Sequence, residues 1–404
     1  MFTYLVCMGG AVKALRIIFF VLLVVALVLA GMSLVFAPKG FPEGSKTDQR
    51  AALRDYPVQS ESIDLRDESR VTQANKDVPE KAGRALAGLV FFPHSETASQ
   101  KRFPLVIYSH GFSSSHKGGE YLGRYLAGLG FVVAMVDFPL TNMYAEGGPF
   151  VKDVVNQPAD VSFLIDTLLE RSQREGDVLS GLIDPERIGA MGVSLGGFTS
   201  TLLAYHPTMG DPRVDAAISI AGPSSLFTER FFASRSLPFM MIGGTYDVLV
   251  PFETNAAPIQ SKAPDAWLLS IEGGAHTAFS GPAAAFRFLD NVDVIGCWAV
   301  LRNTEGDLDE PWYDLLGDES IGINQKDRPV LCEDPVPENA MNVVQQQWIT
   351  QVAVGAFFEM TLSSDPQKQG LAREFLANSF ASEIAEVQVS TPADGLISAL
   401  GGTE

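Results

Sequence analysis

The sequence predicts an α/β fold in which a mostly parallel central sheet carries helices on both faces. Seven short apolar runs recur between residues 85 and 272, and most of them are uniformly apolar rather than alternating. Strands that are buried on both faces of a parallel sheet have this texture. Segments with helical periodicity separate several of the runs, which indicates strand–helix–strand units and a three-layer domain.

The apolar runs are the predicted strands. In chain order they are Ala85–Phe92, Pro104–Ser109, Phe131–Phe138, Ile188–Val193, Ala216–Ala221, Pro238–Gly243 and Trp267–Glu272. The predicted helices are Gly119–Leu129, Pro158–Arg171, Gly196–Tyr205, Val343–Leu362 and a shorter one around Leu371–Phe380. The second of these helices repeats apolar residues at i, i+3, i+4, i+7 and i+8, which is the spacing of a face that packs on a core.

Length and charge limit the possible organisation. The chain has 404 residues, 46% of them apolar, and a formal net charge of -19. Such a negative surface argues against nucleic acid as a partner, because phosphates would repel it. We expect an N-terminal anchor or signal at 1–37, a linker at 38–84, the main domain at 85–362 and a C-terminal tail at 363–404.

The N-terminus predicts targeting or anchoring. Lys13 and Arg16 precede an uncharged apolar run, residues 17–37, that is long enough to cross a bilayer as a helix. Basic residues before such a run favour an N-inside orientation, with the remainder exported to the periplasmic or extracellular side. We favour a retained membrane anchor over a signal cleaved after Val35-Phe36-Ala37, and either of them over a buried core helix.

An acidic insertion follows the last predicted strand of the domain, within 290–340. Residues 290–338 carry 13 acidic and 3 basic residues, a net charge of -10, and both Cys297 and Cys332. In an oxidising compartment these cysteines are expected to form a disulfide, the alternative being two unpaired buried thiols. Calcium binding at 307–310 is a weaker hypothesis than a solvated acidic surface, so no metal site is predicted.

A nucleophile motif lies where one strand ends and a helix begins. Gly192-Val193-Ser194-Leu195-Gly196 has the G-x-S-x-G pattern, in which serine occupies a sharp turn and its neighbours two positions away must be small. The motif alone is weak in a glycine-rich chain, and its position between a strand and a helix strengthens it. The helix N-terminus also offers free N–H groups to an oxyanion.

The acid and the base are predicted from chain order and position. Asp247 follows the strand Pro238–Gly243, and His276 follows the strand Trp267–Glu272. Each residue therefore lies beyond the carboxyl end of a strand, the edge where open parallel sheets place their sites. His276 would accept the serine proton, and Asp247 would hold the imidazole tautomer and stabilise its charged form. The other histidines fit less well, and His206 is expected to face solvent.

The oxyanion hole needs two N–H donors. Leu195, directly after the nucleophile, supplies one, and Phe112 in the loop after the second predicted strand is the candidate for the other. The alternative for this loop is a plain turn at Gly111. By position alone, Met143, Tyr144 and Tyr246 are candidates for the substrate cleft.

Five segments in order carry a family resemblance: PLVIYSHGFSSS, QPADVSFLIDTLL, IGAMGVSLGG, GGTYDVLVP and GGAHTAF. Together they resemble the dienelactone-hydrolase-like and platelet-activating-factor-acetylhydrolase-like branch of the α/β-hydrolases, which also resembles bacterial polyester hydrolases. The resemblance covers roughly 85–290 and 343–362. It implies the α/β-hydrolase fold, a triad of Ser194, Asp247 and His276, and donors at Phe112 and Leu195. Classical dienelactone hydrolases use cysteine where this chain has serine, which puts lactone chemistry in doubt.

These observations predict a serine hydrolase that cleaves carboxylic esters through an acyl-enzyme, without a cofactor. The expected substrate is a small-molecule, lipid or polymer ester. Two other functions stay open: a peptidase or amidase with the same triad, and a non-catalytic binding module on a hydrolase scaffold. The absence of a large cap or propeller within 85–290 weakens the first, and the intact triad residues weaken the second.

Overall fold

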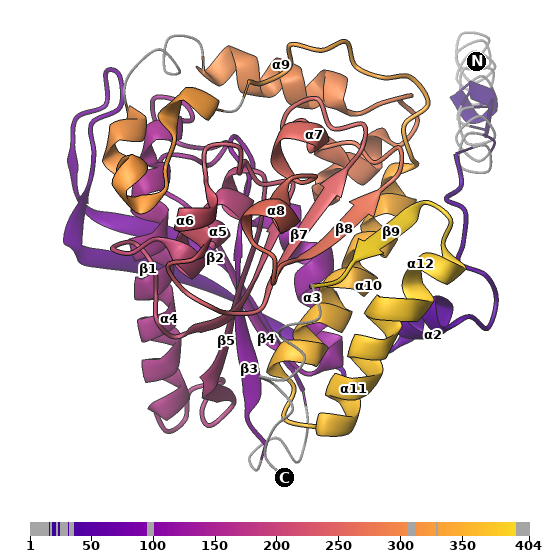
Figure 1. Cartoon of the computed structure of the whole chain (residues 1–404), viewed down its shortest axis with the longest axis horizontal. Helices are drawn as coiled ribbons and strands as arrows, with labels where there is room; N and C mark the ends of the chain where they lie inside the picture. Colours follow the sequence, from indigo (N-terminus) through magenta and orange to yellow (C-terminus); the bar gives the residue numbers. More distant parts are fainter. Residues whose placement is uncertain are drawn as a thin grey trace, which may run out of the picture.

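A nine-stranded sheet forms the centre of the molecule, in the strand order β1-β2-β4-β3-β5-β6-β7-β8-β9 (Figure 1). The computed structural model describes residues 36–94, 101–304, 312–328 and 330–392, together with positions 16, 18–21, 23, 24 and 31. Neighbouring strands from β4 through β8 in this order pair in parallel. Strands β1, β2 and β9 pair antiparallel at the two edges. The prediction of a largely parallel sheet is confirmed, and the sheet is mixed at its edges.

All seven predicted strands are present, and two more join them. The strands are β1 (Val58–Thr72), β2 (Lys81–Pro93), β3 (Phe103–Ser109), β4 (Val132–Asp137), β5 (Ile183–Val193), β6 (Val214–Ile220), β7 (Phe239–Gly244), β8 (Trp267–Ile271) and β9 (Val387–Ser390). The longer helices are α2 (Lys46–Ala52), α3 (Glu120–Leu129), α4 (Gln157–Gln173), α5 (Leu195–Tyr205), α9 (Asp293–Thr304), α10 (Val343–Leu362) and α11 (Pro366–Glu374). Short helices α6 (Glu229–Phe232), α7 (Phe252–Asn255), α8 (Ile259–Lys262) and α12 (Phe380–Glu383) complete the described part.

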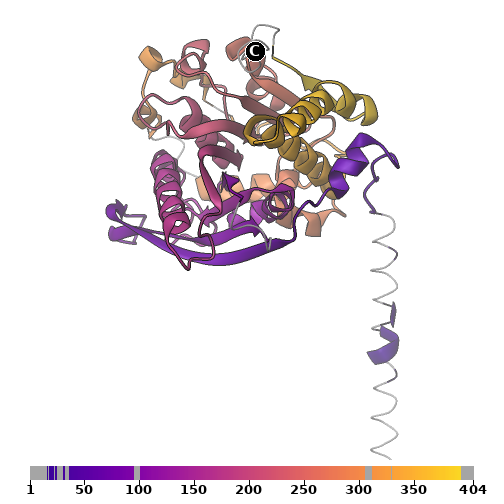
Figure 2. The same cartoon turned by 90° about the horizontal axis from the view of Figure 1, so that it is seen from below.

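Helices cover both faces of the sheet, as Figure 2 shows from a second direction. On strand β3, Leu105 and Ile107 pack with residues of α4 and α5 in one core cluster. The alternate residues Val106 and Tyr108 pack with α3 and α10 in the other. Successive side chains of a strand point to opposite faces, so a strand buried on both sides needs apolar residues at every position. This requirement explains the uniformly apolar runs.

The predicted linker at 38–84 and tail at 363–404 differ from the structure. Helix α2, strand β1 and the start of β2 occupy the first segment, and strand β9 of the second pairs with β8. Strand β1 (VQSESIDLRDESRVT) exposes most of its side chains, because it lies at an edge of the sheet. Its polar composition is that of a one-sided edge strand, which resembles a linker when only hydrophobicity is considered.

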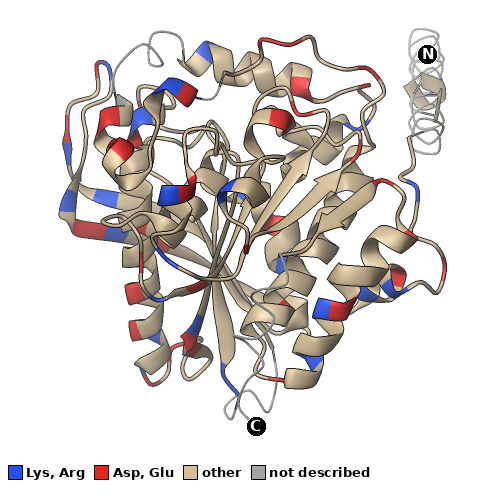
Figure 3. Cartoon of the chain, in the orientation of Figure 1, with Lys and Arg blue, Asp and Glu red and all other residues tan. Residues whose placement is uncertain are grey.

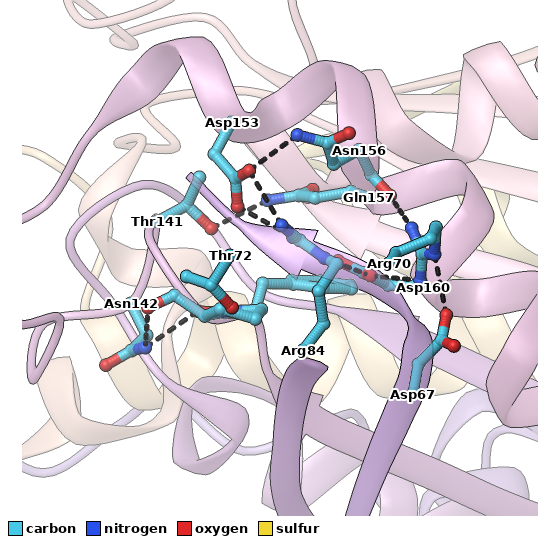
Figure 4. Close-up of polar contacts among 12 residues, drawn as sticks. Asp67, Arg70, Thr72, Arg84, Thr141, Asn142, Asp153, Asn156, Gln157 and Asp160 are labelled. Atoms are coloured by element: carbon cyan, nitrogen blue, oxygen red, sulfur yellow. Dashed lines mark hydrogen bonds and ion pairs between the residues drawn. The ribbon is translucent and has the colours of Figure 1, made fainter. Parts of the chain in front are cut away.

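A buried ionic cluster ties β2 to the segment before α4 (Figure 4). The Arg84 guanidinium is 1% exposed and donates to both Asp153 and Asp160, with N–O distances of 2.7–3.1 Å. Next to this cluster, Gln157 donates to Thr141 at 2.7 Å and accepts a hydrogen bond from Thr199 of α5. Helix α5 is therefore held in place one turn beyond its first residue.

The predicted membrane segment at 17–37 lies for the most part outside the described residues. Among the helices that the structure does describe, none combines the length and the apolar character needed to span a bilayer.

Candidate active site

Ser194 occupies a strained turn between β5 and α5. Its φ of +57° and ψ of -120° lie in a region that residues with a side chain rarely adopt. The Ser194 N–H donates to the carbonyl of Ile220 on the neighbouring strand at 2.8 Å, which holds the turn against the sheet. Strain of this kind costs about 1–3 kcal/mol and persists where the surroundings enforce it.

The two glycines of the motif are sterically required. A Cβ placed on Gly192 would lie 2.2 Å from the carbonyl carbon of Gly196, and one on Gly196 would lie 1.9 Å from the carbonyl oxygen of Ser109. No real Cβ atom tolerates such distances. The glycines therefore let strand, turn and helix approach closely enough to present Ser194 at the carboxyl edge of the sheet.

Asp247 and His276 form a buried pair at the same edge. The His276 Nδ1 lies 2.7 Å from the Asp247 Oδ2, and each residue is 5% exposed. The other Asp247 oxygen accepts the N–H of Val250 at 2.7 Å. This arrangement fixes the ring so that Nδ1 carries a proton and Nε2 is free to act as an acceptor.

The pKa values of this pair reflect burial and mutual attraction. Burial raises the pKa of Asp247 to about 6, although His276 opposes the shift. Burial also works to lower the pKa of His276, but the Asp247 carboxylate outweighs it, and Asp293 adds to the same effect, so this pKa is raised above its usual value. The Asp247 carboxylate therefore stabilises the charge that the imidazole gains when Nε2 takes up a proton.

Asp293 is a buried carboxylate that the sequence did not point to. Its side chain accepts the N–H of His276 at 3.0 Å, the N–H of Thr277 at 2.7 Å and the N–H of Val248 at 3.4 Å. The residue is 0% exposed and begins helix α9. It therefore joins the loop that carries Asp247 to the loop that carries His276. Asp at a helix start is a common signal, but it does not reveal which loops the carboxylate contacts.

The loop after β3 brings Phe112 next to Ser194. A Cβ on Gly111 would meet the Ser194 Cβ at 3.3 Å, so the two turns are in close approach. Within the described residues, the structure records no acceptor for the Phe112 N–H. Leu195 is the first residue of α5, and its N–H has no acceptor within the helix. His110 is buried beneath this loop, where its Nε2 accepts the N–H of Phe138 at 3.0 Å.

Two cavities meet at Ser194. One is lined by Phe112, Val151, Ser194, Leu195, Phe198, Pro223, Leu226, Leu249, Val250, Val300, Thr304, Tyr313 and Leu331. The other contains His276, and its wall combines hydroxyl-bearing residues (Ser113, Ser114, Ser115, Thr277 and Ser280) with apolar ones such as Met143, Phe286, Val292 and Ile295. Phe112, Ser194, Leu249 and Val300 line both. The first cavity is called the apolar lobe below, and the second the histidine lobe.

Helix α9 lies across this edge of the sheet, above the ends of β7 and β8 (Figure 1). Near its start, a Cβ on Gly296 would lie 2.1 Å from the Thr277 Oγ1. The helix therefore packs directly on the loop after β8 that carries His276, called the histidine loop below. Near its end, the Asn303 Nδ2 donates to the Ser113 Oγ at 3.2 Å, beside Phe112. The helix thus connects the two loops that flank Ser194.

The predicted disulfide is present in the insertion. Cys297 of α9 is bonded to Cys332, with a Cα–Cα distance of 5.8 Å. The Cys332 N–H donates to the carbonyl of Val248 at 2.8 Å, and both cysteines pack near Val248 and Leu249. The insertion is therefore attached to the loop that carries Asp247. The segment considered for calcium binding, 307–310, lies outside the described residues. Figure 3 shows acidic positions along the loops of the insertion.

The predicted cleft residues have different positions. Met143 lines the histidine lobe. Tyr144 lines another cavity, next to β1 and β2, and Tyr246 is not among the residues that line either lobe. The solvent-facing prediction for His206 is wrong: the residue is 5% exposed and its Nε2 lies 2.7 Å from the carbonyl oxygen of Leu316 in the insertion.

Comparisons with known proteins agree on the core. A model of the PET hydrolase-like family (PETase) matches residues 69–286. The chain is 25% identical over 217 residues to Cutinase 1 of Thermobifida cellulosilytica, covering 50% of this chain and 74% of that protein. It is 25% identical to a cutinase of Thermobifida fusca, covering 50% and 64%. It is 29% identical over 181 residues to the bis(hydroxyethyl) terephthalate hydrolase of Streptomyces coelicolor, covering 44% and 50%.

Proposed function

The chain belongs to the PET hydrolase-like family, whose model matches residues 69–286 of its 404, and on this premise we propose that it is a serine hydrolase of carboxylic esters. The proposed triad is Ser194 as nucleophile, His276 as general base and Asp247 as the acid that orients it. The relatives named cutinase and bis(hydroxyethyl) terephthalate hydrolase support an ester as the bond that is cleaved.

The reaction proceeds through an acyl-enzyme. The Ser194 Oγ attacks the ester carbonyl carbon while the His276 Nε2 takes the hydroxyl proton. The N–H groups of Phe112 and Leu195 donate to the oxyanion that forms. The intermediate collapses, the C–O bond to the alcohol breaks, and His276 returns the proton to the departing oxygen. Water then attacks the acyl-enzyme by the same steps, releasing the acid and restoring Ser194.

One observation carries this proposal. A serine held in a strained turn shares a cavity with a histidine whose other ring nitrogen is bonded to a buried carboxylate. Strain and a desolvated ion pair both cost folding free energy, and such features gather at functional sites.

The test is hydrolysis of p-nitrophenyl acetate combined with covalent labelling by a fluorophosphonate. The wild-type protein should turn over the ester and take up one label at Ser194, and Ser194→Ala should lose both while unfolding at an unchanged or higher temperature. Ser261→Ala, on the exposed side of α8, is the matched control and should behave as wild type. A folded wild-type protein without turnover or label would support a binding module instead.

A peptidase or amidase is the second candidate, because the same triad can cleave an amide. A p-nitroanilide with the same acyl group distinguishes the two bonds. We expect the ester to react far faster, and a comparable anilide rate would favour the peptidase.

We also propose that the domain works outside the cytoplasm. The disulfide supports this location, since such bonds persist in oxidising compartments. The basic residues before the apolar segment 17–37 support export in the same direction. Fractionation of cells with an antibody to the domain, before and after alkaline carbonate washing, would locate it and distinguish a retained anchor from a cleaved signal.

A further inference from the structure

The acidic insertion supplies part of the wall next to the nucleophile. Val300, Thr304, Tyr313 and Leu331 line the apolar lobe, and all four belong to the insertion. The family match ends at residue 286, before any of them. The chemistry of this lobe is therefore decided partly by residues that the family model does not include.

The position of His276 assigns the two lobes to the two halves of an ester. His276 protonates the departing alcohol, so the alcohol must lie on the histidine side of Ser194. His276 lines only the histidine lobe, whereas Leu195, one of the proposed oxyanion donors, lines the apolar lobe. The acyl group then extends into the apolar lobe, away from His276.

The lining of the apolar lobe defines the acyl group that it can hold. Among its described lining residues none carries a charge, and Ser194, Thr304 and Tyr313 alone have a side-chain hydroxyl. Burying a carboxylate among such residues without a partner would cost several kcal/mol.

We propose, on the basis of the hydrolase function above, that the insertion builds an acyl pocket that selects monomeric esters of an uncharged apolar acid. A polyester is the poorer substrate, because its acyl unit carries a second ester whose polar group would lie among the apolar residues of the lobe. The alcohol lies in the histidine lobe, which is lined by both hydroxyl-bearing and apolar residues.

The insertion is held firmly enough to act as a wall. Its start is fixed to the loop that carries His276 through Asp293 and the close approach of Gly296 to Thr277. Its middle is fixed to His206 through the carbonyl of Leu316, and its end to the loop that carries Asp247 through Cys332. A segment attached at these points keeps its side chains at a constant distance from Ser194. Selection by size requires such a fixed wall.

Leu331 is the position for the test, since it lines the apolar lobe and not the histidine lobe. The experiment measures kcat/KM of the full chain for p-nitrophenyl acetate, butyrate, octanoate and hemisuccinate. Leu331→Trp should lower kcat/KM for octanoate by about tenfold or more while acetate changes little, because the added ring fills the lobe. Leu331→Ala should shift the preference toward octanoate. The hemisuccinate should be a poor substrate for the wild type.

Val330 provides the matched control, because it is 51% exposed, next in the chain to Leu331, and lines neither lobe. Val330→Trp and Val330→Ala should leave the acyl profile unchanged. If Leu331→Trp does not fold, Thr304→Phe narrows the apolar lobe from the end of helix α9 and should give the same profile, because Thr304 does not line the histidine lobe.

Three outcomes would overturn the acyl pocket. The Leu331 variants could change all four rates by the same factor, the hemisuccinate could react as fast as the butyrate, or a polyester film could be degraded more readily than a monomeric diester of the same acid. If the wild type did not hydrolyse p-nitrophenyl acetate, the proposed serine hydrolase function itself would be contradicted. The acetate rate therefore distinguishes failure of the pocket from failure of the proposed function.

Discussion

Residues 69–286 and the insertion at 290–338 contribute to one site by different means. The first region presents Ser194, Asp247 and His276 just beyond the ends of the parallel strands β5, β7 and β8. In its described residues the insertion contributes no strand to the sheet, and helix α9, a disulfide and Asp293 hold it in place. The proposed triad thus belongs to the core, and part of the wall around it belongs to an irregular segment.

Because the two regions contribute differently, the chemistry of the site and the shape of its cavity can vary independently of each other. Substitutions in the strand ends change the chemistry, whereas substitutions in the insertion change the shape of the cavity and the charge around it. Asp293 and Cys332 are the points where the two regions meet, because both bond to the loops that carry the proposed acid and base. The four predictions below test this division, in order of decreasing expected effect.

Asp247→Asn should lower kcat for ester hydrolysis by about 10⁴-fold, because the amide no longer holds the required tautomer or stabilises the imidazolium. Steady-state kinetics at pH 8 would measure the loss. Asp265→Asn, which changes an exposed carboxyl before β8, should behave as wild type. A loss of less than tenfold in Asp247→Asn would contradict the proposed role of Asp247. It would also contradict the assignment of the whole triad to residues 69–286.

Arg84→Met should destabilise the core by about 3–5 kcal/mol, because Asp153 would remain buried without an ion-pair partner and Asp160 would keep only Arg70. Urea unfolding followed by circular dichroism gives the free energy of unfolding. Arg66→Met is the matched control on the adjacent strand, where the pair with Glu68 is exposed and should contribute no more than about 1 kcal/mol. Equal losses in both variants would contradict the structural role of the cluster.

The double variant Cys297→Ser with Cys332→Ser should lose about 2–4 kcal/mol, since the bond closes a loop with a sequence separation of 35 residues. Amide hydrogen exchange should rise mainly in α9 and the following loops, and little in β5 to β8. Wild-type protein treated with a reductant should match the variant. Faster exchange across the sheet as well would mean that core and insertion unfold as one unit.

Asp293→Asn should lower kcat/KM by about tenfold and move the acid limb of its pH profile to lower pH. The negative charge of Asp293 favours the protonated imidazole, so its removal lowers the pKa of His276 and keeps the base available at lower pH. The charged groups that face His276 are Asp247 and Asp293, and Asp247 is unchanged in this variant.

The control for this prediction is Asp290→Asn, an exposed residue that accepts the N–H of Asn339 and does not contact the histidine loop. Its pH profile should overlay that of the wild type. An unshifted acid limb in Asp293→Asn would leave the residue a purely structural role in joining the two loops.

The sequence predicted the strands that are buried on both faces, because burial demands apolar residues at every position there. The two outermost strands were not predicted. Strand β1 mixes polar and apolar residues, and β9 has only four residues, in a segment whose sequence suggested a peripheral position. For the site, order along the chain and position at strand ends made Ser194, Asp247 and His276 the candidates, since strand ends in this fold converge on one edge. The geometry brings Asp247 and His276 together, and their roles stay predictions until tested.

Contacts made by the insertion could not be predicted in the same way. Asp293 and His206 bond to partners whose position depends on the path of an irregular segment, and no periodic pattern encodes that path. An acidic stretch is usually a solvated surface, and most of the described acidic residues of the insertion are exposed. Asp293 is buried instead, and only the path of the backbone identifies it as the exception. The positions of side chains on regular elements were therefore easier to predict than the contacts of an irregular segment.

The turn at Ser194 has a thermodynamic consequence for the whole molecule. Its backbone conformation suits glycine, so Ser194→Gly relieves about 1–3 kcal/mol of strain. Glycine also makes the unfolded chain more flexible, which takes back about 0.4–1 kcal/mol. The protein is thus less stable than an inert version of itself. Selection of random variants for thermal resistance alone would therefore favour variants that have lost Ser194, the proposed nucleophile. Stabilised variants of this molecule have to be screened for ester turnover at every round.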